Sequence, residues 1–298
     1  MDASLYLGPL VQLPIEWLAL ALLALGCLFW ERAGLSGLGI EGCVASAWLG
    51  LFFGYEATGH LAVAVLACLG AALVFAAATG SLVQLSRVDP ALGTFVASLV
   101  PWSALVLLLR SHAPLLATGS PDAWLIHGTG VDDTYAAVLL LNPAVWVAPL
   151  LIVLGAAILA QTPFGLRLRA FGENPGWWVP GAPPAAYRIG AVAVGGLFAA
   201  PAVVLLARSH AAAPPAALGI LALACVIAAR WSLVPAILLA GGPALVRALR
   251  PLGGTKPEWG IALDLAPYLV ALVYLMFLSR RALRLSLSPQ TGTDPDVL

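Results

Sequence analysis

The feature that most constrains the fold is a series of long apolar stretches without a charged residue. The longest runs for 33 residues, from Thr134 to Leu166, and eight others contain 14 to 30 residues each. A helix needs roughly 20 apolar residues to cross a hydrocarbon core about 30 Å thick. The runs do not alternate in hydrophobicity as barrel strands do, and backbone groups in lipid must be hydrogen-bonded within the segment. The sequence therefore predicts an all-α polytopic membrane protein.

Composition excludes several other classes of protein. Hydrophobic residues make up 61% of the chain and charged residues 9%, with a mean hydropathy of +0.98. An average soluble domain has roughly 25% charged residues. A soluble enzyme, a disordered chain and a nucleic-acid binder are therefore excluded. The 14 basic and 14 acidic residues balance, so no overall basic charge favours an acidic partner.

The apolar stretches predict about nine transmembrane helices, within a range of eight to ten. The expected spans are 13–30, 37–55, 61–80, 90–109, 138–161, 186–207, 212–229, 231–248 and 262–279. We expect a single transmembrane domain over residues 1–287 and a flexible C-terminal cytoplasmic tail over 288–298. The N-terminus has no basic residue before its first apolar run, which favours a retained span over a cleaved signal.

The distribution of Lys and Arg predicts the orientation. Placing the loop around 162–185 in the cytoplasm puts nine of the fourteen basic residues inside and five outside, in agreement with the positive-inside rule. The N-terminus is then outside and the C-terminus cytoplasmic. Five prolines lie within the expected spans, at positions 101, 143, 149, 201 and 235. They predict broken helices, which are either substrate-site features or ordinary kinks.

The four cysteines, by contrast, carry no sign of a site. Cys27, Cys43, Cys68 and Cys225 all lie in apolar runs and show no metal-ligand spacing. We therefore interpret them as small hydrophobic residues and expect no metal site.

The first informative segment follows the first span and reads ERAGLSGLGIEG over residues 31–42. Glu31 and Arg32 are adjacent, so their side chains need not pair with each other. Glu41 stands at membrane depth, where an ionisable group costs about 2.5–3.5 kcal/mol, so we expect it to face a partner, a cavity or a backbone donor. The glycines allow an irregular, tightly packed backbone. Five residues of the segment are expected to be structural: Glu31, Arg32, Gly34, Gly39 and Gly42.

The second informative segment reads TPFGLRLRAFGENP over residues 162–175. Phe164, Leu168 and Phe171 are spaced to form one apolar stripe on a helix, and Arg167 and Arg169 lie off that stripe. Gly172 and the following proline end the helix. The pattern predicts a short amphipathic helix over about 163–175. Such a helix either lies on lipid headgroups or docks a cytosolic partner, and the pattern alone leaves both open.

At these two segments the chain resembles the permease subunits of ABC importers of the nucleoside, ribose and branched-chain amino-acid type, and most closely the nucleoside-type branch. The family pattern is close to ERSGVLNLGLEG at the first segment and TRFGLRLRAVGENP at the second. The stretch APYLV over 266–270 resembles the family's last span. The resemblance covers most of the chain, from about Trp17 to Arg281.

The resemblance implies that the chain is no enzyme but a transport subunit in a prokaryotic cell membrane. Its partners would be a second permease, ABC ATPase subunits and an extracytoplasmic solute-binding lipoprotein. ATP and Mg²⁺ would be bound by the ATPase partners, and this chain has no GxxxxGK[ST] motif. The amphipathic helix would be the coupling helix that docks on the ATPase. Its docking residues would be Phe164, Gly165, Leu166, Arg167, Arg169, Phe171, Gly172, Glu173, Asn174 and Pro175.

Candidates for the substrate pathway follow from depth in the membrane and from chemistry. A small polar solute with a ring favours aromatic stacking and a few polar groups. The candidates are Glu41, Ser98, Trp102, Asn142 and Trp146. The amide at Asn142 is alternatively an interhelical hydrogen-bonding group, and the two tryptophans are alternatively packing residues.

Two departures from the family leave the function partly open. After GENP the chain reads GWWVPGAPP, without an acidic residue, and SRVDP stands where the family has an Asn-Gln pair. These two departures are compatible with a different cargo, or with a divergent homologue that does not transport. An ion-coupled secondary transporter is a further alternative, although acidic residues within spans are nearly absent apart from Glu41. A membrane enzyme would need catalytic groups gathered at one depth, which the sequence lacks.

Overall fold

The computed structural model describes residues 4–86, 88–118, 143–173, 184–210, 216–249, 265–274 and 276. All regular secondary structure in these residues is helical, which confirms the all-α prediction. The helices are α1 (Ser4–Arg32), α2 (Gly39–Thr58), α3 (Leu61–Ser86), α4 (Pro90–Thr118), α6 (Pro143–Gln161), α7 (Pro163–Glu173), α8 (Pro184–Leu197), α9 (Ala199–His210), α10 (Leu218–Ala228), α11 (Leu233–Ala248) and a C-terminal helix, Leu265–Tyr274.

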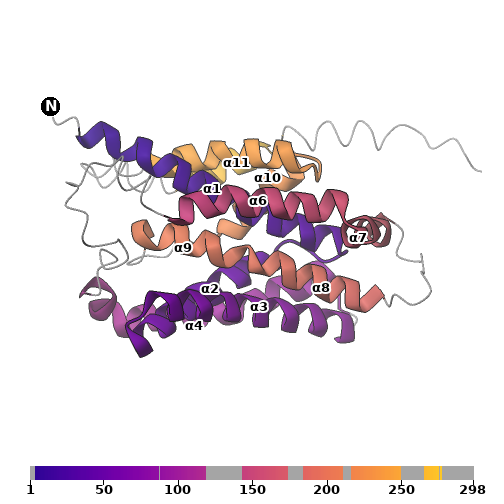
Figure 1. Ribbon diagram of the computed structural model, residues 1–298, viewed down its shortest axis with the longest axis horizontal. Helices are drawn as coiled ribbons and strands as arrows, with labels where there is room; N and C mark the ends of the chain where they lie inside the picture. The colour runs from indigo at the N-terminus through magenta and orange to yellow at the C-terminus, as the bar shows by residue number, and fades with distance from the viewer. Residues whose placement is uncertain are drawn as a thin grey trace, which may run out of the picture.

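The long helices form an elongated bundle, and α7 lies across one end of it (Figure 1). Helix α1 is the centre of the bundle, since it packs against α6, α8, α9, α10 and α11. Helices α2, α3 and α4 form a second group, joined to the first through α8, α9 and α10. Helix α1 begins at the end opposite α7 (Figure 1). We call these the α7 end and the opposite end.

The described helices correspond to the nine expected spans, but not all of them are long enough to cross a membrane. Four are long and apolar enough: Gln12–Arg32, Leu61–Ser86, Pro90–Arg110 and Ala185–Ala207. The bent pair α6–α7 would make a fifth. The expected spans 212–229, 231–248 and 262–279 contain shorter helices of 10–17 residues. By length and composition, the described residues therefore contain four or five full spans, and parts of the expected spans 212–229 and 262–279 lie outside the described residues.

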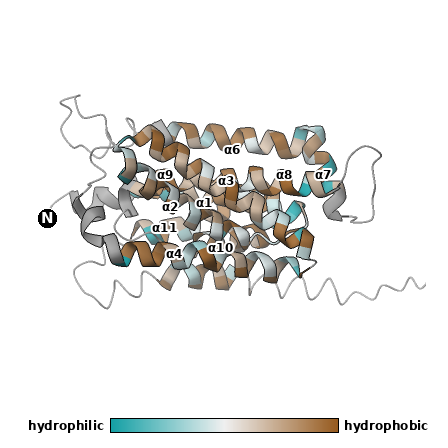
Figure 2. Cartoon of the chain, turned by 90° about the horizontal axis from the view of Figure 1, so that it is seen from below, coloured by the Kyte–Doolittle hydropathy of each residue, from teal (hydrophilic) through white to brown (hydrophobic). Residues whose placement is uncertain are grey.

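Hydrophobic residues follow the length of the bundle, and hydrophilic residues gather mainly toward its two ends (Figure 2). The break between α8 and α9 falls at Phe198, within one 23-residue apolar span, in agreement with the predicted broken helices. The innermost large side chains include Trp30, Trp48 and Phe29, all fully buried. Phe29 stacks on Phe198 with ring centroids 5.7 Å apart, so the α8–α9 break packs directly against α1.

Candidate functional site

A sharp elbow joins α6 to α7, and the sequence TPFG forms it. The axes of the two helices differ by 63°. The Thr162 hydroxyl donates to the carbonyl of Ile158 at 2.6 Å and accepts from the Gly165 N–H at 3.2 Å, which caps the start of α7. Pro163 takes the first helical position, where no N–H is needed. A side chain at Gly165 would overlap the carbonyl oxygens of Ile158 and Leu159, so the elbow requires glycine.

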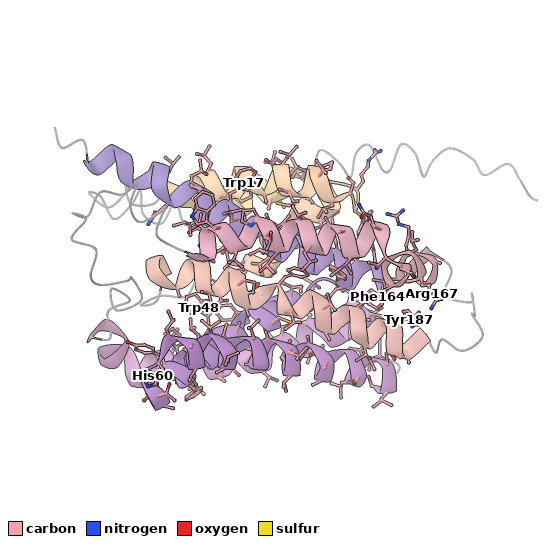
Figure 3. The ribbon with its side chains drawn as sticks, viewed as in Figure 1. Trp17, Trp48, His60, Phe164, Arg167 and Tyr187 are labelled. Carbon is pink, nitrogen blue, oxygen red and sulfur yellow. The ribbon has the colours of Figure 1, made fainter. Side chains whose placement is uncertain are left out.

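The apolar side of α7 faces the bundle, an arrangement that the sequence analysis did not predict. Leu168 is fully buried. Phe164 stacks on Tyr187 of α8 (Figure 3), with ring centroids 5.8 Å apart and an interplanar angle of 21°. The Phe164 ring also lies beside Gly190. The described part of α7 runs to Glu173, so the expected stop at Gly172 and Pro175 is not tested by the described residues. The side chains of Phe171, Gly172 and Glu173, and all of Asn174 and Pro175, lie outside the described residues.

The opposite side of α7 is exposed and cationic. Leu166 is 54% exposed, and the side chains of Arg167 and Arg169 are exposed. Arg167 donates to the Tyr187 hydroxyl, and its guanidinium lies 5.8 Å from the centroid of that ring (Figure 3). Because Tyr187 also stacks on Phe164, one residue of α8 fixes both sides of the first turns of α7.

Glu31 and Arg32 lie near the α7 end and do not pair with each other. The Glu31 carboxylate accepts from the Gly37 N–H at 2.8 Å and from the Trp231 indole at 3.3 Å. Arg32 donates to the carbonyl of Trp231 at 3.4 Å. Both residues therefore tie the end of α1 to the turn between α10 and α11, in which Arg230 and Trp231 have positive φ angles of 53° and 55°.

The glycines of the first segment have distinct structural roles. Gly34 has a φ of +75°, which favours glycine. A side chain at Gly39 would overlap the Trp30 ring, and one at Gly42 would overlap the Phe75 ring. The segment is thus packed too tightly for larger residues.

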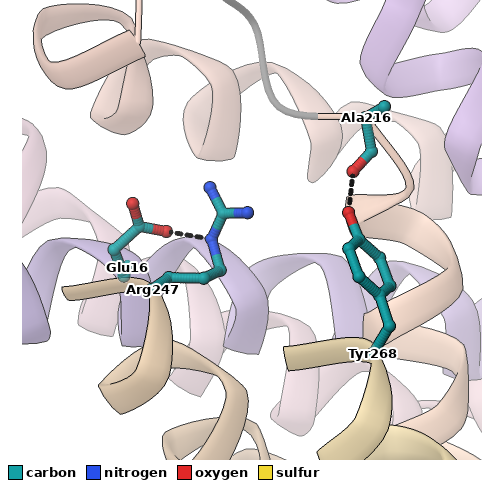
Figure 4. A network of polar contacts seen from close by, with 4 residues as sticks. All are labelled: Glu16, Ala216, Arg247 and Tyr268. Atoms are coloured by element: carbon teal, nitrogen blue, oxygen red, sulfur yellow. Dashed lines mark hydrogen bonds and ion pairs between the residues drawn. The ribbon is translucent and has the colours of Figure 1, made fainter. Parts of the chain in front are cut away.

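Glu41 is buried among backbone donors, as the sequence predicts for an acid at this depth. The side chain is on α2, and the residue is 7% exposed. Its Oε1 accepts from the Ala217 N–H and its Oε2 from the Gly219 N–H, each at 2.6 Å. These donors are the N-terminal amides of α10. Next to this turn, the Tyr268 hydroxyl donates to the carbonyl of Ala216 at 2.7 Å (Figure 4).

The substrate-pathway candidates fall in two places. Ser98 and Trp102 of α4 lie close to the start of α2: the Ser98 hydroxyl donates to the Leu38 carbonyl at 3.4 Å, and Trp102 is among the groups around Glu41. The Trp102 Nε1 atom is buried. Trp146, by contrast, is 59% exposed on α6, which packs on α1, α7 and α9. Asn142 lies outside the described residues.

The sequence analysis missed a buried ion pair between α1 and α11. The Arg247 Nε donates to Glu16 Oε2 at 2.8 Å, with side chains 10% and 3% exposed respectively (Figure 4). Next to it, the Trp17 indole donates to the Ile237 carbonyl at 2.7 Å. The available signal was a lone Glu inside the first apolar run, but nothing in the sequence identifies Arg247 as its partner.

These features define a polytopic all-α membrane protein with a bent surface helix at one end and a half-helix capped inside the bundle. A family model described as the branched-chain amino acid transport system permease component matches residues 11–276. The chain therefore belongs to that family of transport permeases. Neither the curated proteins nor the solved structures contain a significant match.

Proposed function

We propose that the chain is the permease subunit of an ABC importer, with α7 as the coupling helix that docks on the ATPase partner. The observation that carries this proposal is the geometry of α7. It lies across one end of the bundle, buries Leu168, and exposes Leu166, Arg167 and Arg169. Guanidinium groups form charge-assisted hydrogen bonds with carboxylates, and an exposed leucine can enter an apolar pocket of a partner.

The contacts of α7 support a role in transmitting movement. The Gly165 elbow joins it to α6, and the Phe164–Tyr187 stack and the Arg167–Tyr187 hydrogen bond join it to α8. It also packs against α1. A partner that moves α7 would therefore move three helices of the bundle, which is the rigid-body coupling that alternating access requires.

The proposed assembly contains a second permease, ATPase subunits that bind ATP and Mg²⁺, and an extracytoplasmic solute-binding lipoprotein. In this arrangement the α7 end is cytoplasmic and α1 begins outside, in a prokaryotic cell membrane. The outward apolar faces of α3, α4 and α6 would contact lipid or the second permease.

The cargo we propose is a nucleoside or a related small polar compound, on the basis of the two segments that resemble the nucleoside-type branch. Trp102 supports a ring-bearing cargo, because an indole face stacks on heteroaromatic rings. This cargo would pass the α2–α4 region near the start of α2.

Crosslinking with a matched pair of cysteines tests the docking role of α7. The four native cysteines are buried, so a thiol crosslinker should react mainly with a cysteine introduced at an exposed position. Leu166→Cys places the thiol on α7, and His60→Cys places it at an exposed position at the opposite end (Figure 3). In native-host membranes, a thiol crosslinker should join Leu166→Cys, but not His60→Cys, to a protein whose peptides include an ABC ATPase P-loop.

Charge reversal sharpens this experiment. Arg167→Glu combined with Arg169→Glu should reduce the ATPase adduct of Leu166→Cys at least tenfold, as expected for the loss of two charge-assisted contacts. An unchanged adduct, or an adduct from His60→Cys alone, would contradict the docking role. Uptake by the purified chain alone, driven by an ion gradient without ATP, would instead support a secondary transporter.

A further inference from the structure

Helix α10 is a half-helix that begins inside the bundle. Its 11 residues have a length of about 16 Å at 1.5 Å per residue, roughly half of a hydrocarbon core. Its first turn lies beside Cys27, whose Sγ is 3.8 Å from the Gly219 carbonyl oxygen. Cys27 is more than one turn before the end of α1 at Arg32. The N-terminus of α10 is therefore within the packed interior and away from the α7 end.

A helix that begins in the apolar interior of a bundle needs acceptors for its first backbone N–H groups. The first four N–H groups of any helix lack a partner within the helix, and lipid offers no water to replace it. Here the Glu41 carboxylate accepts from Ala217 and Gly219 through its two separate oxygens, each at 2.6 Å. Both oxygens face N–H donors, an arrangement that suits the ionised carboxylate, and the positive end of the helix dipole also favours an anion there.

We propose that Glu41 is a positioning residue, which fixes the start of α10 for transport and does not bind the cargo. The inference extends the proposed function, since the transport readout below depends on it. The geometry supports positioning over binding because the two carboxylate oxygens are already engaged by the protein backbone. A cargo group that bound to Glu41 would have to displace two short hydrogen bonds in a site where the residue is only 7% exposed.

The turn before α10 also has a hydrogen bond from a second helix. The Tyr268 hydroxyl, from the C-terminal helix, donates to the Ala216 carbonyl at 2.7 Å. The next residue, Ala217, has a φ of 59°, a left-handed conformation that alanine rarely adopts. Such a conformation persists only where its surroundings enforce it. Glu41 of α2 and Tyr268 together supply that constraint, so the turn connects two helices far apart in the sequence.

Gly219 completes the contact with Glu41. A Cβ built at this position would lie 2.6 Å from the Glu41 backbone N and 2.9 Å from its Oε2. Only glycine allows α2 and α10 to approach this closely. Gly219→Ala therefore disturbs the same contact as a substitution of Glu41, but from the opposite helix and without removing the carboxylate.

Hydrogen exchange on the full-length protein in detergent tests the positioning role directly. In the wild type, the peptide that contains residues 217–221 should be protected. Glu41→Gln should speed its exchange about tenfold, because an amide offers one acceptor oxygen and turns an N–H₂ group toward a backbone donor. Glu41→Asp, which keeps the charge on a shorter side chain, should lie between the two. Gly219→Ala should resemble Glu41→Gln.

Glu56→Gln is the matched control, because Glu56 is an exposed glutamate of the same helix α2. It should leave the exchange of this peptide unchanged. An unprotected peptide in the wild type, or equal exchange in Glu41→Gln and Glu56→Gln, would overturn the proposal, and the wild-type result decides even if a variant fails to fold.

Transport kinetics separate positioning from cargo binding. With radiolabelled uridine as the probe, Glu41→Gln should lower the maximal uptake rate at least tenfold with KM within about twofold of the wild type, and Glu41→Asp should partly restore the rate. A raised KM with unchanged exchange would make Glu41 a cargo ligand and reject the inference. If the wild type takes up no uridine, the proposed cargo is wrong, whereas the exchange experiment still decides the role of Glu41.

Discussion

Helices α1 and α3 are both long and apolar, yet they occupy opposite environments. In the span of α1, 78% of the residues are buried, compared with 22% in α3. The more hydrophobic of the two, α3, is the more exposed. In a soluble protein the order would be reversed, since water drives the most apolar helix inward. The comparison shows that the hydrophobicity of a helix does not determine whether it lies in the interior of this bundle.

Two properties distinguish the buried helix from the exposed one. Lipid is as apolar as leucine, so helices associate through close packing and polar contacts. Helix α1 carries Glu16, Trp17 and Gly26, each engaged with another helix. Helix α3 has no charged residue, and it buries mainly a stripe of small residues at four-residue intervals. These residues are Ala64, Cys68, Ala72, Ala76 and Gly80.

The largest effect is expected at the polar contact that α1 has and α3 lacks. Glu16→Ala leaves the Arg247 guanidinium without its carboxylate in a buried position. Removing one partner of a buried ion pair typically costs about 3–5 kcal/mol. The apparent melting temperature of the purified protein in detergent should fall sharply, and unfolding titrations should give the free energy change.

A double substitution shows whether the unpaired charge causes this loss. Glu16→Leu combined with Arg247→Met replaces the pair with apolar side chains and should recover most of the stability, because no unpaired charge is left. A double variant as unstable as Glu16→Ala would mean that packing at this position, and not the unpaired charge, sets the cost.

A pair of identical leucine truncations gives the next largest contrast. Leu22 of α1 is fully buried, whereas Leu66 of α3 is 67% exposed. Leu22→Ala opens a cavity and should cost about 2–5 kcal/mol. Leu66→Ala exchanges side-chain contacts for lipid contacts and should cost less than about 1 kcal/mol. Equal losses in the same unfolding titration would show that the outward face of α3 is covered by protein in detergent.

The smallest contrast is between two glycines. A Cβ at Gly26 of α1 would lie 2.6 Å from the Gly195 carbonyl oxygen, whereas Gly70 of α3 has open space around it. Gly26→Ala should destabilise by about 1–3 kcal/mol through overpacking. Gly70→Ala should be neutral or stabilise by up to about 1 kcal/mol, since alanine favours a helix. Thermal unfolding measures both, and a destabilising Gly70→Ala would indicate a close neighbour on that face.

Much of the local structure could be predicted from the sequence. The two segments around Glu41 and Arg167 were identified from charge, glycine content and helical spacing. The predicted apolar stripe is confirmed at Phe164 and Leu168, and Glu41 faces backbone donors, one of the three environments expected for it. The stripe depends on spacing over one or two helical turns, which the sequence encodes directly.

The partners of these segments could not be predicted. Tyr187 is 20 residues from Arg167, Ala217 is 176 residues from Glu41, and Arg247 is 231 residues from Glu16. The spacing within one helix says nothing about which other helix it meets. For the same reason, the sequence does not show that α10 begins inside the bundle, since α10 is apolar like its neighbours.

The sequence by itself determined that this is a helical membrane protein with an amphipathic helix between two apolar spans, because charge-free length and helical periodicity are local properties. Only the tertiary structure decided which apolar helix is central, which carboxylate caps α10 and which arginine neutralises Glu16. In lipid every apolar face is acceptable to the solvent. The arrangement is therefore set by close contacts of small residues and by buried polar pairs, whose members meet only when the chain has folded.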